Sequence, residues 1–365
     1  TTQNFPPATG GIENLMYSLA SALTAEGRSI TVFADRSHGK DTADFDRSCN
    51  FKIIRYSGIK PWRRRKKARA LEVFGKQAEH KPAILIADSW KSLEHPDCHD
   101  YSRILCLAHG SELPQQPASS KLLRLQKALS KATYIVANSH YTATQLQAYI
   151  SDPNKIKVIH PGIDAPPRDA ATEQKIYEIV GQNSPILLTI ARLEQRKGQQ
   201  NVIRILPQLI KYYPSLLYVI VGSGSNQALL EKTIKELGIN AHVLFTGPLN
   251  ARYKSAYLAN SDLFIMPGSK VGQDVEGFGM AYIESACFGV PAIACDVGGA
   301  PEAVLHNQTG LVCAPGDLQQ LQAGVRRLLQ DQALYERLAN NARDRSRKFL
   351  WDDKIKEYCD LLDHN

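Results

Sequence analysis

The clearest candidate chemistry lies in two carboxylates eight positions apart, Glu276 and Glu284. Glu276 belongs to a glycine-rich segment with Gly277 and Gly279, and Glu284 lies in the helix expected to begin near Gly279. The glycines let backbone N–H groups approach an anion, and a helix N-terminus adds partial positive charge, so a phosphate fits there. The carboxylates would repel that phosphate and should instead face sugar or ribose hydroxyls. The segment therefore predicts a sugar-nucleotide ligand.

Two cations upstream suit a diphosphate. Arg192 follows a strand expected at 185–190, and Lys197 precedes the next helix. A guanidinium can bind two phosphate oxygens at once, whereas lysine acts as a point charge. Charge that develops on a diphosphate leaving group must be neutralised by such fixed cations. An Arg and a Lys on one loop are common, but their place at the carboxyl end of a strand favours a functional reading.

Helices and strands alternate along the chain. Apolar residues at helical spacing predict a helix over 11–26, with others near 119–130 and 139–150. Short apolar runs predict strands at 30–33, 51–56, 83–87, 103–107, 134–137, 156–159, 185–190, 216–221, 243–246, 263–266 and 291–294. This alternation indicates parallel sheets covered by helices on both faces. Doubly wound domains usually start with a strand, and no apolar run precedes Gln3, so we expect the first strand to be missing.

Proline and glycine between 161 and 167 indicate a linker. We therefore expect an N-terminal domain at 1–163, a C-terminal domain at 164–349 and a final helix at 350–365. The chain has 365 residues, enough for two domains with proper cores. It has no apolar run long enough to cross a bilayer and no signal-like start, so we expect a soluble, cytoplasmic protein. The seven cysteines are scattered and expected to be reduced.

The net charge of +8 belongs to the N-terminal half, where residues 1–163 hold 23 Lys and Arg against 14 Asp and Glu. The densest basic run lies at 62–69 and includes Arg63, Arg64 and Arg65. One reading is a solvated helix face. The other is a surface for anionic lipid headgroups or an anionic acceptor, with Trp62 at the interface.

Several motifs together resemble the retaining glycosyltransferases of family 4. They are the E-x7-E pair of Glu276 and Glu284, the R-x4-K-G of Arg192 to Gly198, the Gly-Gly-Ile-Glu at 10–13 and the Gly-Gly-Ala-Pro-Glu at 298–302. The resemblance covers essentially the whole chain. It implies the GT-B fold, in which two facing Rossmann-like domains enclose a cleft and the last helix crosses back to the N-terminal domain.

The resemblance also implies roles for individual residues. It assigns the diphosphate to Arg192 and Lys197, donor-sugar hydroxyls to Glu276 and ribose hydroxyls to Glu284. His109 would lie beside the reacting sugar, with Glu112 near it. Further donor or nucleotide contacts are expected at Gly10, Gly11, Gly222, Gly247, Leu249, Gly277, Phe278, Gly279 and Met280, and acceptor-side candidates are Glu13, Glu112, Arg63, Arg64 and Arg65. A plain turn remains the alternative for Gly10 and Gly11.

The implied activity is retaining transfer of a hexose from GDP-mannose or a UDP-sugar to a lipid-linked or polysaccharide acceptor in cell-envelope glycan synthesis, such as that of lipopolysaccharide. A phosphate oxygen of the leaving group can take the acceptor proton. We expect no cofactor and no metal, although Asp44 and Asp46 have the D-x-D spelling of a metal site in what reads as a polar loop. Alternatives are a sugar-nucleotide epimerase or phosphorylase of the same fold and a basic nucleic-acid-binding protein, but no nucleic-acid reader motif appears.

Overall fold

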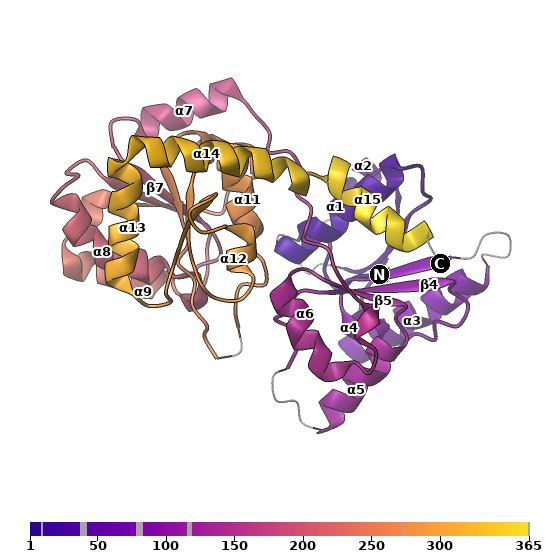
Figure 1. Cartoon of the computed structure of the whole chain (residues 1–365). Coiled ribbons are helices and arrows are strands. Elements are labelled where there is room, and N and C mark those ends of the chain that lie inside the picture. Colours follow the sequence, from indigo (N-terminus) through magenta and orange to yellow (C-terminus); the bar gives the residue numbers. More distant parts are fainter. Residues whose placement is uncertain (9, 37–41, 78–82, 115–118, 273, 364–365) are drawn as a thin grey trace. The chain divides into compact units, whose positions relative to one another are not determined.

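The computed structural model describes residues 1–8, 10–36, 42–77, 83–114, 119–272 and 274–363. The chain divides into two compact units. Unit 1 comprises Thr1–Asp164 and Phe349–Asn365, and unit 2 comprises Ala165–Lys348 (Figure 1). None of the described helices is long and apolar enough to cross a membrane.

Unit 1 contains only parallel strand pairs among its described residues. A two-stranded sheet pairs β1 (Thr31–Asp35) with β2 (Lys52–Tyr56). A four-stranded sheet has the order β3 (Ile84–Ala87), β4 (Arg103–Ala108), β5 (Tyr134–Ala137) and β6 (Ile156–Val158). All six strands predicted for this half are confirmed.

The first two residues of the chain lie between these sheets. The Thr2 backbone N–H donates to Phe33 O at 3.0 Å, and the Asp88 N–H donates to Thr1 O at 3.0 Å. Thr2 also forms an isolated parallel bridge with Ala34. Residues 1 and 2 therefore occupy the place between β1 and β3 where the expected first strand would run.

Helices cover the sheets of unit 1. They are α1 (Gly11–Ala25), α2 (Ala43–Ser48), α3 (Lys60–Lys76), α4 (Trp90–Leu93), α5 (Ser119–Ser130), α6 (His140–Leu146) and α15 (Trp351–Asp363). The last helix, α15, shares one buried core with α1, in which Trp351 and Tyr358 pack with Leu19. Gly162 fits under the Trp351 ring, because a Cβ there would lie 2.7 Å from the ring.

Unit 2 is built on a six-stranded parallel sheet. Its order is β12 (Gly310–Cys313), β11 (Ala292–Cys295), β10 (Leu263–Ile265), β7 (Ile186–Ile190), β8 (Leu217–Val221) and β9 (Val243–Gly247). The flanking helices are α7 (Ala170–Val180), α8 (Gln199–Ile210), α9 (Gln227–Leu237), α10 (Ala251–Ala259), α11 (Met280–Cys287), α12 (Ala300–Ala303), α13 (Leu318–Gln330) and α14 (Gln332–Ser346), and Figure 1 shows them on both sides of the sheet. Almost every residue of β7 and β8 is buried, as strands covered on both faces should be.

Candidate active site

The loop that carries Arg192 and Lys197 follows β7, which lies between β10 and β8 in the sheet of unit 2. The chain reaches β8 on one side of β7 and β10 on the other, so this is the topological switch point of the sheet. Open α/β sheets bind ligands outside the carboxyl ends of their strands at such points. The fold therefore places the predicted diphosphate cations where a ligand site is expected.

Five charged side chains, four from this loop and Glu276 from the segment before α11, form a chain of alternating charge. Glu194 links Arg192, through Nη1 at 2.7 Å, with Arg196, through Nε at 3.1 Å. Arg196 Nη1 lies 3.4 Å from Glu276 Oε2, and Lys197 Nζ forms an ion pair with the same oxygen. Arg192 is the most exposed of the five, with 69% of its side chain accessible. Three cations against two carboxylates leave a net positive site.

Glu276 is held more tightly than the sequence indicated. Burial acts to raise its pKa, but the charges and hydrogen bonds of Lys197 and Arg196 outweigh burial and hold the pKa below its usual value. Both cations contact Oε2, and Oε1 makes no hydrogen bond to the described part of the chain. Because Glu276 is ionised, its Oε1 can accept a hydrogen bond from a sugar hydroxyl.

Arg196 is a site residue that the sequence reasoning missed. It belongs to a 3-10 turn over Gln195–Lys197, which places the side chains of Arg196 and Lys197 on the same carboxylate. The only sequence signal was its position inside the Arg192 to Lys197 segment.

Glycines allow the loops of this site to pack closely. The Glu276 carbonyl accepts a hydrogen bond from Gly299 N–H at 2.8 Å, and a Cβ on Gly298 would lie 2.2 Å from that carbonyl oxygen. Gly198 has a φ of +78°, and a Cβ there would lie 2.0 Å from Pro267 O. The Gly-Gly-Ala-Pro-Glu motif at 298–302 thus positions the backbone of Glu276.

The remaining predicted residues of unit 2 border the same strand ends. Gly222 donates its N–H to Gly247 O at 2.9 Å, and its missing side chain admits Ala191 O. Leu249 is partly exposed just before α10. Four others lie at the start of α11, where Phe278 is buried and Gly279, at φ +97°, caps the helix that begins at Met280 after Gly277.

Glu284 lies one turn into α11 and is partly exposed. It makes no hydrogen bond or ion pair to the residues that the structure describes. Its neighbours Ile283 and Ser285 are buried, so this helix packs inward as expected. A partly exposed carboxylate without a protein partner is free to accept hydrogen bonds from ligand hydroxyls.

In unit 1, His109 follows β4 and is only 9% exposed. Its Nε2 lies 2.9 Å from Asp88 O, and because a carbonyl oxygen can only accept, Nε2 carries the proton. The His109 backbone N–H donates to Glu112 Oε1 at 2.7 Å, and Asn138 donates to the His109 carbonyl at 3.3 Å. The ring is therefore fixed in one orientation.

Glu112 does lie near His109, but its carboxylate serves the backbone. One oxygen accepts the His109 N–H, and the other, Oε2, is buried without a hydrogen-bond partner. The Glu112 carbonyl accepts from Trp90 Nε1 at 3.3 Å. These contacts stabilise the turn after β4. The acceptor role assigned to Glu112 stays a prediction.

Gly10 and Gly11 open α1 as expected. The Glu13 carboxylate folds back over Gly10, since a Cβ on Gly10 would lie 2.1 Å from Glu13 Oε2. Glu13 therefore already occupies the space over this glycine, and an anionic ligand there would have to move it.

The basic run 62–69 does not form one surface, because its side chains point in different directions around α3. Arg63 Nε lies 3.0 Å from Asp35 Oδ2 and Lys67 Nζ lies 2.8 Å from Asp35 Oδ1. Arg64 Nη1 lies 3.8 Å from Glu94 Oε2. Arg63 and Arg64 thus face carboxylates of unit 1, whereas Arg65 is exposed, and the acceptor-side role of all three arginines stays a prediction.

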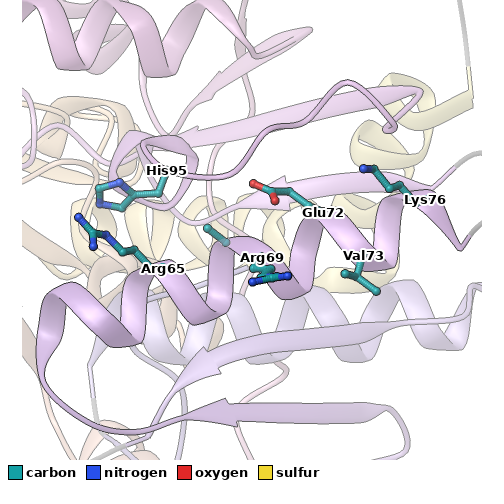
Figure 2. Close-up of a pocket in the computed structure, with 7 residues that line it drawn as sticks. Arg65, Arg69, Glu72, Val73, Lys76 and His95 are labelled. Atoms are coloured by element: carbon teal, nitrogen blue, oxygen red, sulfur yellow. The ribbon is translucent and has the colours of Figure 1, made fainter.

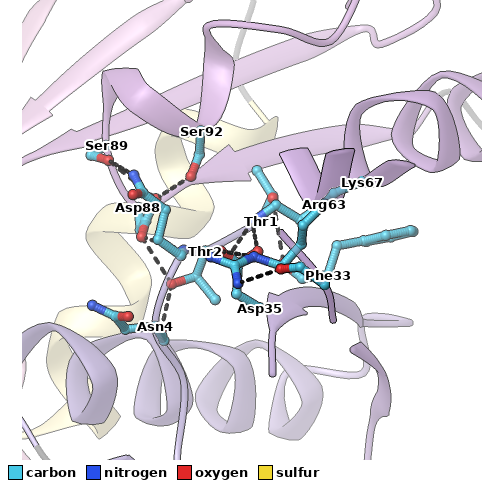
Figure 3. A network of polar contacts seen from close by, with 12 residues as sticks. Thr1, Thr2, Asn4, Phe33, Asp35, Arg63, Lys67, Asp88, Ser89 and Ser92 are labelled. Carbon is cyan, nitrogen blue, oxygen red and sulfur yellow. Dashed lines mark hydrogen bonds and ion pairs between the residues drawn. The ribbon is translucent and has the colours of Figure 1, made fainter. Parts of the chain in front are cut away.

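Figure 3 shows Thr2 between the two carboxylates Asp35 and Asp88. The Thr2 hydroxyl donates to Asp88 Oδ2 at 2.9 Å, and the Thr2 carbonyl accepts from Lys67 Nζ at 2.8 Å. Asp88 also accepts from Gln3 N–H at 2.8 Å and the Ser92 hydroxyl at 2.5 Å. This buried network fixes the segment whose carbonyl holds the His109 ring.

The D-x-D spelling lies in a helix, not in a polar loop as expected. Asp44 and Asp46 belong to α2, which begins at Ala43. Asp46 forms an ion pair with Arg55 at 2.7 Å, and Asp44 pairs with Arg47. Both carboxylates are engaged by arginines of the same unit.

Comparisons with known proteins agree with this geometry. Residues 9–165 match the family model Glycosyltransferase Family 4, and residues 172–345 match Glycosyl transferases group 1. The chain is 28% identical to the GDP-mannose-dependent alpha-(1-6)-phosphatidylinositol monomannoside mannosyltransferase of Mycobacterium tuberculosis, over 99% of this chain and 96% of the relative. It is also 28% identical to the monoacylated-substrate counterpart of Corynebacterium glutamicum, over 90% of this chain and 88% of the relative.

Two solved structures show the same fold. The Anabaena protein Alr3699/HepE in complex with UDP aligns with a TM-score of 0.81 at 20% identity, over 99% of this chain and 98% of that one. Sucrose-phosphate synthase from Thermosynechococcus elongatus aligns with a TM-score of 0.79 at 21% identity, over 99% and 97% of the two chains.

Proposed function

Because this chain joins a Glycosyltransferase Family 4 domain to a Glycosyl transferases group 1 domain in a confirmed GT-B fold, we propose that it is a retaining, metal-independent hexosyltransferase. It moves a hexose from a nucleoside-diphosphate sugar to a hydroxyl of a lipid-linked or polysaccharide acceptor. The acceptor oxygen bonds to the anomeric carbon on the face that the nucleotide leaves. The bond from that carbon to the diphosphate breaks, and a phosphate oxygen takes the acceptor proton.

The cation cluster after β7 is the observation that carries this proposal. Arg192, Arg196 and Lys197 converge at the switch point of the sheet, and each is already balanced by a carboxylate. An incoming diphosphate would compete with Glu194 and Glu276 for these cations. Once the diphosphate has bound these cations, the Glu276 carboxylate could accept hydrogen bonds from hydroxyls of the donor sugar. Fixed cations of this kind stabilise the negative charge of the departing nucleotide.

The relatives favour GDP-mannose as donor. The mannosyltransferases of Mycobacterium and Corynebacterium align over most of both chains and are named as GDP-mannose-dependent. The loop before Glu276 is compatible with a UDP-sugar as well, and UDP-sugars are therefore the alternative in the test. The acceptor we propose is a glycolipid of the cell envelope, since the same relatives act on phosphatidylinositol mannosides.

A glycolipid acceptor places the enzyme at a membrane surface. We propose peripheral association with the cytoplasmic face of the membrane through the exposed part of the 62–69 run. Trp62 is 65% exposed, and Arg65, Lys66 and Arg69 are exposed beside it. Arg63, Arg64 and Lys67 face carboxylates of unit 1 and contribute less.

Donor turnover tests the proposal. The purified chain is incubated with GDP-mannose or UDP-glucose, with membrane lipid as acceptor and with a metal chelator, and products are identified by mass spectrometry. Arg196→Gln should lower kcat about 100-fold, as loss of one transition-state donor typically does. Arg204→Gln, an exposed arginine on α8, is the matched control and should leave the rate unchanged.

Three results would contradict the proposal. Conversion of the donor into an isomeric sugar nucleotide without acceptor indicates an epimerase. Full activity of Arg196→Gln would show that this cation of the cluster does not contribute to the reaction. Inversion at the anomeric carbon, read by NMR of the product, excludes the retaining mechanism.

A further inference from the structure

An open hollow of about 720 Å³ lies along α3 in unit 1. It is lined by residues of that helix and by one histidine from the segment after α4: Arg65, Ala68, Arg69, Glu72, Val73, Lys76 and His95. Figure 2 shows Arg65 beside His95 at one end and Lys76 at the other. We propose that this hollow, the α3 pocket, binds the phosphodiester headgroup of an anionic phospholipid at the membrane surface.

The charge of the α3 pocket is the first argument. Arg69 and Lys76 form no ion pair or hydrogen bond within the described ranges, so both cations are available to a ligand. Among the lining residues that the structure describes, Glu72 is the one acid, and its Oε1 already accepts the Asp97 N–H at 3.0 Å. Three cations around an open hollow attract a phosphate, which arginine and lysine recognise by hydrogen bonds and charge.

The cations Arg64, Arg124 and Lys131 near His95 add positive charge at this end of the pocket. Glu94, the neighbouring carboxylate, is taken by Arg124 and lies 3.8 Å from Arg64 Nη1. His95 Nε2 lies 4.0 Å from Glu94 Oε2. Burial and the cations Arg64, Arg124 and Lys131 outweigh Glu94 and lower the pKa of His95. A bound phosphate would reverse that balance and favour the protonated ring.

The helical spacing of α3 is the second argument, and it selects a lipid over a free phosphate. Residues three or four positions apart share one face of a helix. One stripe of α3 carries residues at this spacing, namely Trp62, Arg65, Arg69, Val73 and Lys76. It therefore combines two apolar side chains with three cations. Trp62 is 65% exposed and Val73 is 46% exposed. A stripe of this kind suits the membrane interface, where apolar groups enter the acyl boundary and cations meet headgroups.

The inward cations of the same helix mark the contrast. Arg63 and Lys67 face Asp35 on the opposite side of α3. The basic run is therefore divided between cations that hold the fold and cations that line the α3 pocket. Pocket residues Lys76 and His95 lie outside the basic run, so charge counting along the sequence could not have found them.

This inference rests on the proposed membrane association, and vesicle binding tests it. The full chain is sedimented with phosphatidylcholine vesicles with and without phosphatidylglycerol. The double variant Arg69→Gln/Lys76→Gln is compared with Lys52→Gln/Lys121→Gln, which removes two exposed cations that lie outside both the pocket lining and the basic run 62–69. We expect the pocket variant to lose at least about tenfold more affinity for phosphatidylglycerol vesicles than the control. Both variants lose the attraction of two cations to the anionic surface, but only the pocket pair also loses hydrogen bonds to the headgroup.

A second readout follows the His95 ring by NMR. Glycerophosphoglycerol, the soluble headgroup, should raise the His95 pKa in the wild type and not in the pocket variant. Equal losses in the two double variants would overturn the pocket in favour of diffuse charge. Competition by inorganic phosphate as strong as that by the headgroup would overturn the lipid assignment, as would tighter binding to a random oligonucleotide than to vesicles.

Transfer of mannose to a soluble acceptor separates this inference from the proposed function. The pocket variant should keep the wild-type rate with a soluble acceptor, because no pocket cation belongs to the cluster after β7. Normal vesicle binding without any transfer would sink the proposed function and leave the α3 pocket standing. Normal transfer together with equal vesicle binding by the wild type and the pocket variant would overturn the α3 pocket and leave the proposed function standing.

Discussion

Lys197 and Glu276, 79 positions apart in the sequence, form an ion pair in unit 2 that Arg196 joins from the same turn. The pair connects the R-x4-K-G segment to the E-x7-E segment. Two motifs that the sequence shows separately are thus one electrostatic unit, in which a carboxylate occupies the cations that a diphosphate would use.

The first prediction concerns the pH dependence of stability. Because the folded-state pKa of Glu276 lies below its ordinary value of 4.5, its ionised form stabilises the fold above about pH 4.5. That contribution is lost as the pH falls through the lowered pKa. Urea unfolding between pH 3 and pH 6 should therefore show a steeper acid loss for the wild type than for Glu276→Gln. Parallel curves would show that the pair does not stabilise the fold.

The second prediction concerns Gly298. Gly298→Ala should destabilise unit 2 by more than about 3 kcal/mol, because a φ of +63° strains alanine and its Cβ would lie 2.2 Å from Glu276 O. Gly272→Ala is the control, since its φ of +57° is similar but, apart from its two chain neighbours, no described residue has an atom within 4 Å of the added Cβ. It should cost about 1 kcal/mol of strain. Equal losses of unfolding free energy in the two variants, measured by thermal unfolding, would contradict the close contact between Gly298 and the Glu276 carbonyl.

The third prediction concerns Asp88. Asp88→Ala leaves the Gln3 N–H and the Ser92 hydroxyl without the carboxylate that accepts their hydrogen bonds, which should cost about 2–4 kcal/mol. The substitution should also shift the Asp88 carbonyl that holds the His109 ring, and it should therefore lower kcat more than it raises KM. Asp97→Ala, at a carboxylate that is 64% exposed, should change neither value. An Asp88→Ala protein with wild-type stability and kcat would contradict the positioning role.

The fourth prediction compares adjacent lysines of α3. Lys67→Met removes one of the two cations that face Asp35 and also the donor to the buried Thr2 carbonyl, and Asp35 keeps only Arg63. The substitution should therefore cost about 2–3 kcal/mol. Lys66→Met, at an exposed position, should change the free energy of unfolding by less than about 0.5 kcal/mol. Similar effects of the two substitutions would show that α3 does not divide its cations as described.

The sequence predicted the strands well because buried parallel strands are short apolar runs between turn residues. It predicted the cations at Arg192 and Lys197 from their place after a strand. It missed Arg196, because the turn that brings its side chain to Glu276 has no periodic signature. It grouped Arg63, Arg64 and Arg65 together, although successive residues of a helix point in different directions and each meets a different partner.

Two other differences have the same kind of cause. Asp44 and Asp46 looked like a loop because a six-residue helix is too short to show an apolar stripe. The Asp88 network was invisible, since its donors come from Thr2, Gln3 and Ser92, which only the tertiary fold brings together.

Nucleotide binding by the wild type and by Lys197→Gln tests most directly whether the cations beside Glu276 hold a diphosphate. The change in melting temperature is measured with GDP, UDP, ADP and TDP, because a ligand that binds only the native state must raise its stability. We expect one diphosphate, most readily GDP, to raise the melting temperature of the wild type and to have little effect on that of Lys197→Gln. No shift with any diphosphate, or an equal shift in both proteins, would contradict a diphosphate site at the Lys197–Glu276 pair.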